Sequence, residues 1–130
     1  MRSTIRVYYG DTDAGGVVFH AAYVNFYDRA RTEFFRSQGI ICKELADMNC
    51  AFVVRTIGIE YLSPAFLDDL ICINTYIFEK GKISLRIAQS ISDQNGNIIN
   101  QCDVLLVLVD LIKKKPTRIP FSMLKRLTLS

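Results

Sequence analysis

The chain has 130 residues, half of them apolar, and a formal net charge of +3. This length suits one domain with a real hydrophobic core, so we expect residues 1–130 to form a single domain, and the composition excludes a disordered chain. The longest apolar run, Val104–Val109, is too short to span a bilayer, and the N-terminus lacks the apolar core of a signal peptide. Both features predict a cytoplasmic protein without a transmembrane segment.

The positive charge is spread along the chain, with small clusters at Lys113–Lys115 with Arg118, and at Lys80 with Lys82. Such runs are usually solvated surface, and the alternative is a docking site for phosphate groups or an acidic partner. A few lysines are too weak a signal for nucleic-acid binding. Four cysteines without CxxC spacing and a single histidine predict no metal site and buried thiols in a reducing compartment.

The first half of the chain contains one strand pattern and one long helix pattern. Ser3–Tyr9 is rich in β-branched and aromatic residues, which predicts a strand that Gly10 ends. A loop follows through Gly16, and apolar residues then recur at helical spacing over Ala21–Gln38, with Gly39 as a C-terminal cap. Residues 42–48 could form a short second helix.

The second half is dominated by strand patterns. We predict strands over Phe52–Tyr61, Leu70–Glu79, Ile83–Ser92 and Ile98–Leu111, with an Asn-Gly hairpin in Asp93–Asn97 and a short helix at Ser122–Leu127. The order strand, helix, four strands predicts an α+β fold, in which one long helix packs on a five-stranded antiparallel sheet. Since the helix covers one face only, we expect self-association into dimers or tetramers.

Two groups near the predicted start of the helix could carry chemistry. Asp13 lies in a Gly-rich loop, where it could form an Asx-turn or act as a general base or nucleophile. His20 precedes the helix and could be a capping or packing group, or could bind a substrate carbonyl or orient a water. The unpaired N–H groups of the first helical turn are better oxyanion donors, since they need no particular side chain. Asp11 shares the loop, and we expect it to be the structural carboxylate; the alternative is a pair of carboxylates with Asp13.

Other catalytic patterns are missing from the sequence. It contains no G-x-S-x-G nucleophile elbow and no G-x-G-x-x-G motif, and GDTDAGG lacks the lysine of a Walker phosphate loop. A carboxylate and an amide cluster facing one cleft would instead suit attack on a carbonyl carbon.

The segment DTDAGGVVFHAAYVNFYDRAR (residues 11–31) resembles the signature of the hotdog-fold acyl-CoA thioesterases. It is most similar to the 4-hydroxybenzoyl-CoA thioesterases and to the thioesterases associated with the Tol–Pal envelope system. IEYLSPAFLDDL (residues 59–70) and KPTRIP (residues 115–120) support the resemblance. It implies a hotdog fold, a homotetramer or dimer, a role in lipid metabolism, and hydrolysis of an acyl thioester to free acid and CoA.

The resemblance also implies roles for individual residues. Asp13 is the implied catalytic carboxylate, as nucleophile or general base, and His20 stands at the helix-start amide that polarises the carbonyl. The implied substrate-binding residues are Gly16, Val17, Phe19, Tyr23, Lys80 and Lys82, the two lysines holding CoA. No cofactor is expected, because CoA is part of the substrate. Asp28 stands where relatives usually have Glu, so its role is open.

Two other functions are compatible with this pattern. A hotdog dehydratase or hydratase would also use a histidine and a carboxylate. A non-catalytic module could instead hold acyl carrier protein through the patch from Lys113 to Arg118.

Overall fold

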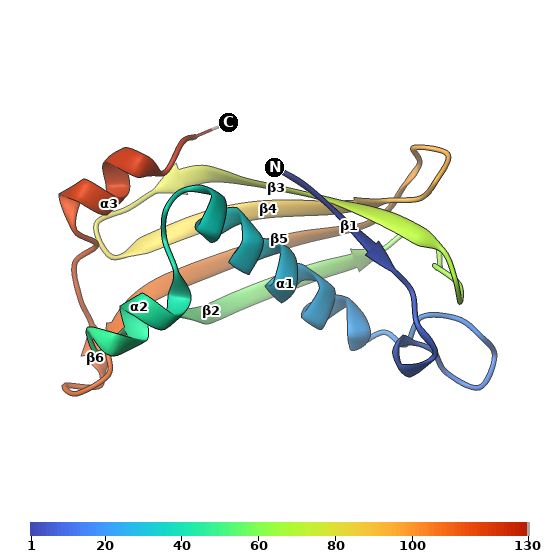
Figure 1. The fold of residues 1–130 in the computed structure, drawn as a ribbon, viewed down its shortest axis with the longest axis horizontal. Coiled ribbons are helices and arrows are strands. Elements are labelled where there is room, and N and C mark those ends of the chain that lie inside the picture. The colour runs from blue at the N-terminus through green and yellow to red at the C-terminus, as the bar shows by residue number, and fades with distance from the viewer. Residues whose placement is uncertain (130) are drawn as a thin grey trace.

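The computed structural model describes residues 1–129 and contains one antiparallel sheet in the order β1–β3–β4–β5–β2. Figure 1 shows its strands, which are β1 (Arg2–Arg6), β2 (Cys50–Tyr61), β3 (Leu70–Lys80), β4 (Ser84–Ser92) and β5 (Ile98–Asp110). A two-residue strand, β6 (Lys115–Pro116), pairs with the end of β5. The α+β arrangement predicted from the sequence is confirmed, with β6 as an addition.

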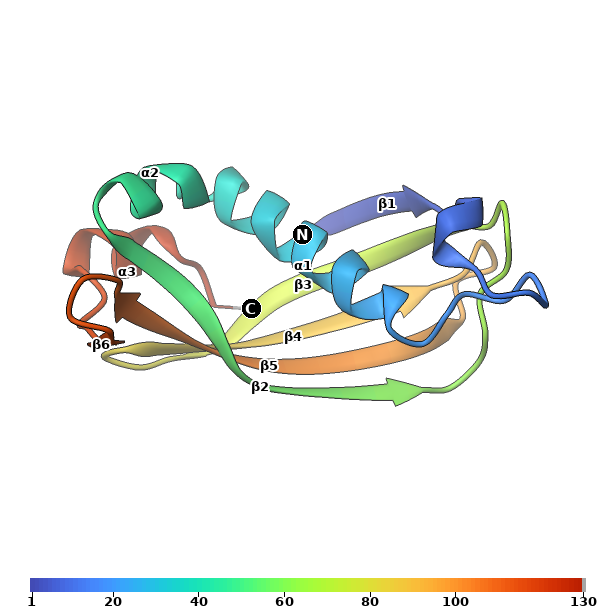
Figure 2. The ribbon, with the colours of Figure 1, turned by 90° about the horizontal axis from the view of Figure 1, so that it is seen from below.

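The long helix α1 (Ala22–Ser37) lies across one face of the sheet (Figure 2). Its buried stripe includes the predicted apolar positions Tyr23, Phe26, Tyr27, Ala30 and Phe34. Gly39 has a φ of 80°, which favours glycine, and the Ile40 N–H then donates to the Phe35 carbonyl at 2.9 Å. The helix therefore begins and ends within one residue of the prediction.

The first strand ends earlier than the predicted Ser3–Tyr9, so the strand prediction for Val7, Tyr8 and Tyr9 was wrong. β1 ends at Arg6, and Tyr9–Asp11 forms a 3₁₀ turn, η1, that leads toward the loop. The turn is held by the Asp11 carboxylate, which accepts a hydrogen bond from the Tyr8 N–H at 2.9 Å. Tyr8 and Tyr9 are 67% and 82% exposed, so the local cap overrides the strand preference of their aromatic rings.

Two short helices complete the chain. α2 (Cys42–Asp47) follows α1, and α3 (Phe121–Arg126) lies at the end of the sheet where β3 turns into β4 (Figure 1). The ammonium group of Lys80 donates to the carbonyls of Leu124 and Leu127 at 3.0 and 2.7 Å. Lys80 thereby fixes the end of α3 to the sheet.

Buried polar side chains fix α1 on the sheet. The Tyr27 hydroxyl donates to Asn100 Oδ1 at 2.6 Å, and Gln89 Nε2 donates to the Tyr27 carbonyl and to Thr75 Oγ1, both at 3.0 Å. Arg31 Nη1 donates to Gln89 Oε1 at 3.0 Å. Because all these groups are buried, the helix has one well-defined position over β3, β4 and β5.

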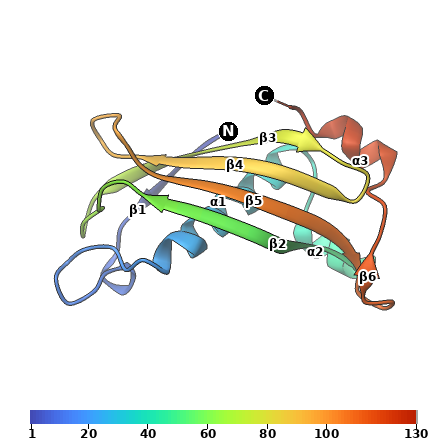
Figure 3. The same cartoon turned by 180° about the vertical axis from the view of Figure 1, so that it is seen from behind.

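The sheet leaves one face and one edge uncovered. Figure 3 shows the face opposite α1, with no helix lying over it. Among the described residues 1–129, β2 pairs with β5 alone, and its Val53, Val54 and Ile57 side chains are exposed. Within residues 1–129, no helix combines the length and apolar character that crossing a bilayer requires.

Candidate active site

The loop between η1 and α1 is a small hairpin tied to the segment that joins β2 and β3. Thr12 bridges Val18, and Val17 bridges Phe66. The Leu67 N–H donates to the Gly16 carbonyl at 3.0 Å, and Gly16 has a φ of 77°. Only glycine adopts this backbone conformation freely, so Gly16 is what lets the loop turn here.

The Asp13 carboxylate faces the turn that it begins. Its Oδ1 atom accepts hydrogen bonds from the Gly15 and Val17 N–H groups at 2.8 and 3.3 Å, which is the geometry of an Asx-turn. Its Oδ2 atom makes no hydrogen bond or ion pair with the described residues, and the side chain is exposed. The carboxylate thus stabilises the loop with one oxygen and leaves the other available.

Two N–H groups just before α1 are unpaired within the described part of the chain. The Phe19 N–H donates to the Asp11 carbonyl, and the Ala22 N–H to the Phe19 carbonyl, each at 2.9 Å. Across residues 1–129, the N–H groups of His20 and Ala21 have no acceptor. The first turn of α1 carries no acidic residue, so its partial positive charge is not neutralised locally.

A cavity of about 270 Å³ opens beside the start of the helix. Its walls combine α1, the residues before it and the end of β2, and they are Val18, His20, Tyr23, Tyr61, Leu62, Ser63 and Pro64. The Tyr61 hydroxyl donates to the His20 carbonyl at 2.9 Å, and its ring meets the Tyr23 ring edge-on at 5.5 Å. The structure therefore brings His20 and Tyr23 together with one half-exposed tyrosine.

Tyr23 is almost fully enclosed at this cavity. Burial raises the pKa of its phenol, and the hydrogen bond from the Ala65 N–H, at 3.2 Å, opposes this effect. The phenol therefore stays neutral at physiological pH and holds the loop before β3 against α1.

The remaining predicted site residues lie in two places. Gly16, Val17 and Phe19 belong to the Asp13 loop, and the exposed Phe19 ring packs on the His20 ring with centroids 4.3 Å apart. Lys80 and Lys82 lie at the opposite end of the sheet, beside α3, where they line a separate cavity with Arg118. Figure 1 shows that the Asp13 loop and the β3–β4 turn lie at opposite ends of the sheet, the loop at the right and the turn at the left.

Asp28 lies outside the helix-start cavity, two turns along α1. Its exposed carboxylate is 3.6 Å from Arg31 Nη2, and this charge partly opposes the lowering of the Arg31 pKa by burial. This places Asp28 beside the buried polar side chains rather than beside Asp13.

Sequence reasoning missed Tyr61 and Ser63 as parts of the cavity. Both lie in the segment Ile59–Leu70, which carried the supporting resemblance, so their position at the end of a strand and before a proline was the available signal. No group of three or more His, Cys, Asp or Glu in the described part of the chain is placed to bind a metal ion. The cavity has aromatic walls and lies beside the unpaired N–H groups, which suit a carbonyl substrate, whereas Asp13 lies in the neighbouring loop and is not among the residues that line it.

Residues 15–99 match the model of the thioesterase superfamily. The chain belongs to this superfamily. It is 46% identical over 121 residues to the acyl-CoA thioester hydrolase YbgC of Escherichia coli O157:H7, covering 93% of this chain and 90% of that protein. It is 40% identical over 117 residues to the acyl-CoA thioesterase YbgC of Haemophilus influenzae, and the match covers 89% of this chain and 85% of that protein.

Solved structures agree with this assignment. The structure of BH1999 gentisyl-coenzyme A thioesterase superposes with a TM-score of 0.91 at 26% sequence identity, and the match covers 98% of this chain and 100% of that chain. A probable thioesterase from Bartonella henselae superposes with a TM-score of 0.87 at 33% sequence identity, and the match covers 92% of this chain and 98% of that chain. The hotdog fold expected from the resemblance is confirmed.

Proposed function

We propose that this chain hydrolyses acyl-CoA thioesters to a free acid and CoA. The support from outside the structure is the high identity to proteins named acyl-CoA thioester hydrolase and acyl-CoA thioesterase, over about nine-tenths of the chain. The support from the site is one observation. A single short hairpin leaves both a carboxylate oxygen, Asp13 Oδ2, and the N–H groups of His20 and Ala21 without partners among residues 1–129.

These groups fit the two demands of thioester hydrolysis. The carbonyl oxygen gains negative charge as the tetrahedral intermediate forms, and unpaired N–H groups at a helix start stabilise that charge. The Asp13 carboxylate then acts on the other side of the carbonyl carbon. The C–S bond breaks, and the sulfur leaves as thiolate and takes up a proton. The acyl carbon gains an oxygen either directly from water or from the Asp13 carboxylate, whose lost oxygen water then replaces.

Asp13 can act in two ways. As a nucleophile it would form a mixed anhydride with the acyl group, which water then opens. As a general base it would remove a proton from the attacking water. A single turnover in oxygen-18 water separates them, because only the nucleophilic route carries label into the Asp13 carboxylate.

The site is completed by a second copy of the chain. The β2 edge has free backbone groups on one side and exposed Val53, Val54 and Ile57, so a second β2 can pair with it and extend the sheet. The uncovered face in Figure 3 offers a further contact, which would give a homotetramer. The pantetheine arm would then lie in a groove between two copies, in a cytoplasmic enzyme of lipid metabolism associated with the Tol–Pal system.

Phe19 and Tyr23 supply apolar contacts for the acyl group, while Gly16 and Val17 let backbone approach it closely. Lys80 and Lys82 would meet phosphate groups, and acyl carrier protein, if it is a partner, would contact the patch from Lys113 to Arg118. This chemistry requires no cofactor, because CoA is part of the substrate.

The test is a thiol-release screen over short, long and aromatic acyl-CoAs, with Asp13→Asn as the control. We expect release from at least one class, and a large loss in the variant. Enoyl formation without thiol release would indicate a dehydratase or hydratase. Salt-sensitive binding to acyl carrier protein without thiol release from any donor would indicate a binding module.

A further inference from the structure

The peptide group that joins His20 to Ala21 is held by a side chain from the end of β2. The Tyr61 hydroxyl donates to the His20 carbonyl at 2.9 Å. No backbone N–H among residues 1–129 reaches this carbonyl, because the Val24 N–H donates to the Ala21 carbonyl instead, at 3.2 Å. Within the described part of the chain, the phenol of Tyr61 is therefore the one hydrogen-bond donor that fixes the orientation of this carbonyl.

The same hydrogen bond also decides where the Ala21 N–H points. The peptide is planar and trans, so its C=O and N–H groups lie on opposite sides and turn together. A hydrogen bond at the carbonyl oxygen also polarises the peptide, which makes the N–H at its other end a stronger donor. The Ala21 N–H has no acceptor among residues 1–129. Tyr61 thus orients and strengthens an N–H that is free to bind a substrate oxygen.

Tyr61 is itself anchored on both sides. It is the last residue of β2, and its backbone is paired with β5. The next two N–H groups, those of Leu62 and Ser63, both donate to the Ile99 carbonyl at 3.0 Å. The Tyr61 ring meets the buried Tyr23 ring edge-on, with centroids 5.5 Å apart. The sheet and this aromatic contact therefore hold the hydroxyl against the start of the helix.

The surroundings of Tyr61 favour a role in the reaction over a purely structural role. The residue is 50% exposed, and it lines the helix-start cavity of about 270 Å³ together with His20. At such an exposed place, water can replace the phenol as the donor to the His20 carbonyl, so the hydroxyl contributes little to folding stability. Water would not hold the peptide in one orientation, and a packed tyrosine does.

We infer that Tyr61 is a positioning residue for the oxyanion donors of this site. It holds the peptide between His20 and Ala21 so that the Ala21 N–H is aimed at the carbonyl oxygen of the thioester. The inference rests on the proposed function, and it adds a residue that does not itself touch the reacting atoms. Negative charge grows on the carbonyl oxygen only as the tetrahedral intermediate forms, so the effect of Tyr61 should appear in kcat rather than in KM.

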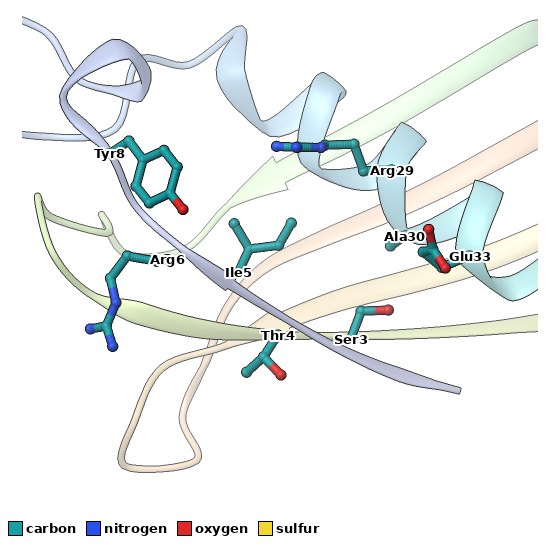
Figure 4. Close-up of a pocket in the computed structure, with 8 residues that line it drawn as sticks. All are labelled: Ser3, Thr4, Ile5, Arg6, Tyr8, Arg29, Ala30 and Glu33. Atoms are coloured by element: carbon teal, nitrogen blue, oxygen red, sulfur yellow. The ribbon is translucent and has the colours of Figure 1, made fainter.

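The experiment compares Tyr61→Phe with Tyr8→Phe. Tyr61→Phe removes the hydroxyl and keeps the ring that packs on Tyr23. Tyr8 is an exposed tyrosine at the same end of the sheet, and its hydroxyl makes no hydrogen bond with residues 1–129. Figure 4 shows Tyr8 in a different cavity, between β1 and α1, so the control variant changes a phenol that does not contact the helix-start peptide.

The first readout is thiol release from the best acyl-CoA. Loss of a whole oxyanion donor costs about 10²–10³-fold in kcat. Tyr61→Phe weakens a donor without removing it, so we expect a loss of roughly 10-fold in kcat, with KM nearly unchanged. The melting temperature and KM should match those of Tyr8→Phe.

Two spectroscopic readouts report on the donor itself. In the amide NMR spectrum of the nitrogen-15-labelled protein without substrate, the Ala21 signal should move in Tyr61→Phe and stay in place in Tyr8→Phe, because the peptide nitrogen responds to a hydrogen bond at the His20 carbonyl. The infrared carbonyl stretch of a bound methylene-ketone analogue of the acyl-CoA reports how strongly the N–H groups polarise the C=O bond. This stretch should have a higher frequency in Tyr61→Phe than in the wild type.

The inference is wrong if Tyr61→Phe has the kcat of Tyr8→Phe, or if neither the Ala21 signal nor the ketone stretch changes. A raised KM, or a melting temperature below that of the control, would also contradict it, because the hydroxyl would then bind substrate or support the fold. Failure of the proposed function has a different signature. The wild-type chain would then release no thiol from any acyl-CoA, whereas the Ala21 signal would still decide whether Tyr61 controls this peptide.

Discussion

Substitutions of Asp13 can separate its role in the turn from its role in chemistry. Oδ1 accepts the Gly15 and Val17 N–H groups, and an asparagine carbonyl oxygen can accept both in the same place. Asp13→Asn should therefore change the free energy of unfolding by less than about 0.5 kcal/mol. Asp13→Ala removes the single oxygen that accepts both hydrogen bonds, and we expect a loss of about 1–2 kcal/mol.

The turnover number should depend on the negative charge of Asp13 and not on the hydrogen bonds that Asp13 makes within the turn. Because asparagine is neither a nucleophile nor a base, Asp13→Asn should lose roughly 10²–10⁴-fold in kcat while KM changes little. The assays are urea denaturation and thiol release on the same preparations. Asp11→Asn is the matched control, since it keeps the acceptor for the Tyr8 N–H and should retain activity. An Asp13→Asn variant as active as the wild type would show that Asp13 only shapes the loop.

Three further outcomes follow from the described contacts. In Gly16→Ala the added methyl group meets no atom within 4 Å, so the loss of stability should come from the φ of +77° alone. Urea denaturation should show a loss of about 1–2 kcal/mol in the free energy of unfolding, and a smaller loss would mean that the loop relaxes. Tyr27→Phe leaves buried Asn100 without its donor and should cost about 1–3 kcal/mol, and an unchanged melting curve would contradict this bond. Burial raises the pKa of the Cys102 thiol from 9.0 to about 11, so its contribution to stability is complete below pH 9 and is lost as pH rises toward 11. The stability difference between wild type and Cys102→Val should shrink over that range, and thiol labelling at neutral pH should reach the exposed Cys42 and not Cys102.

Sequence patterns predicted correctly those elements whose structure depends on neighbouring residues in the chain. The apolar stripe of α1 and the cap at Gly39 follow from spacing and from a positive φ, and both are confirmed. The same holds for the hairpin at Gly96, where φ is 85° and the Asp93 carboxylate accepts the Asn95 N–H at 2.9 Å.

Tertiary contacts decided what the sequence could not show. The aromatic residues Tyr8 and Tyr9 favour a strand, but the Asp11 cap and the hydrogen bond from the Val7 N–H to the Asp69 carbonyl, at 2.9 Å, end it earlier. Tyr61 reaches the His20 carbonyl across a long stretch of chain, so the local sequence places Tyr61 at a strand end but does not show this contact. For the same reason the use of Lys80 in binding α3 is visible only in the folded chain.

The central claim is that Asp13 and the N–H groups before α1 act on one carbonyl group. The most direct test is a crystal structure with a non-hydrolysable CoA analogue, in which a methylene ketone replaces the thioester. We predict that the ketone oxygen lies about 3 Å from the His20 or Ala21 N–H, with the Asp13 carboxylate facing the carbonyl carbon. A ketone bound away from these N–H groups, with both Asp13 oxygens turned toward their own loop, would contradict the mechanism.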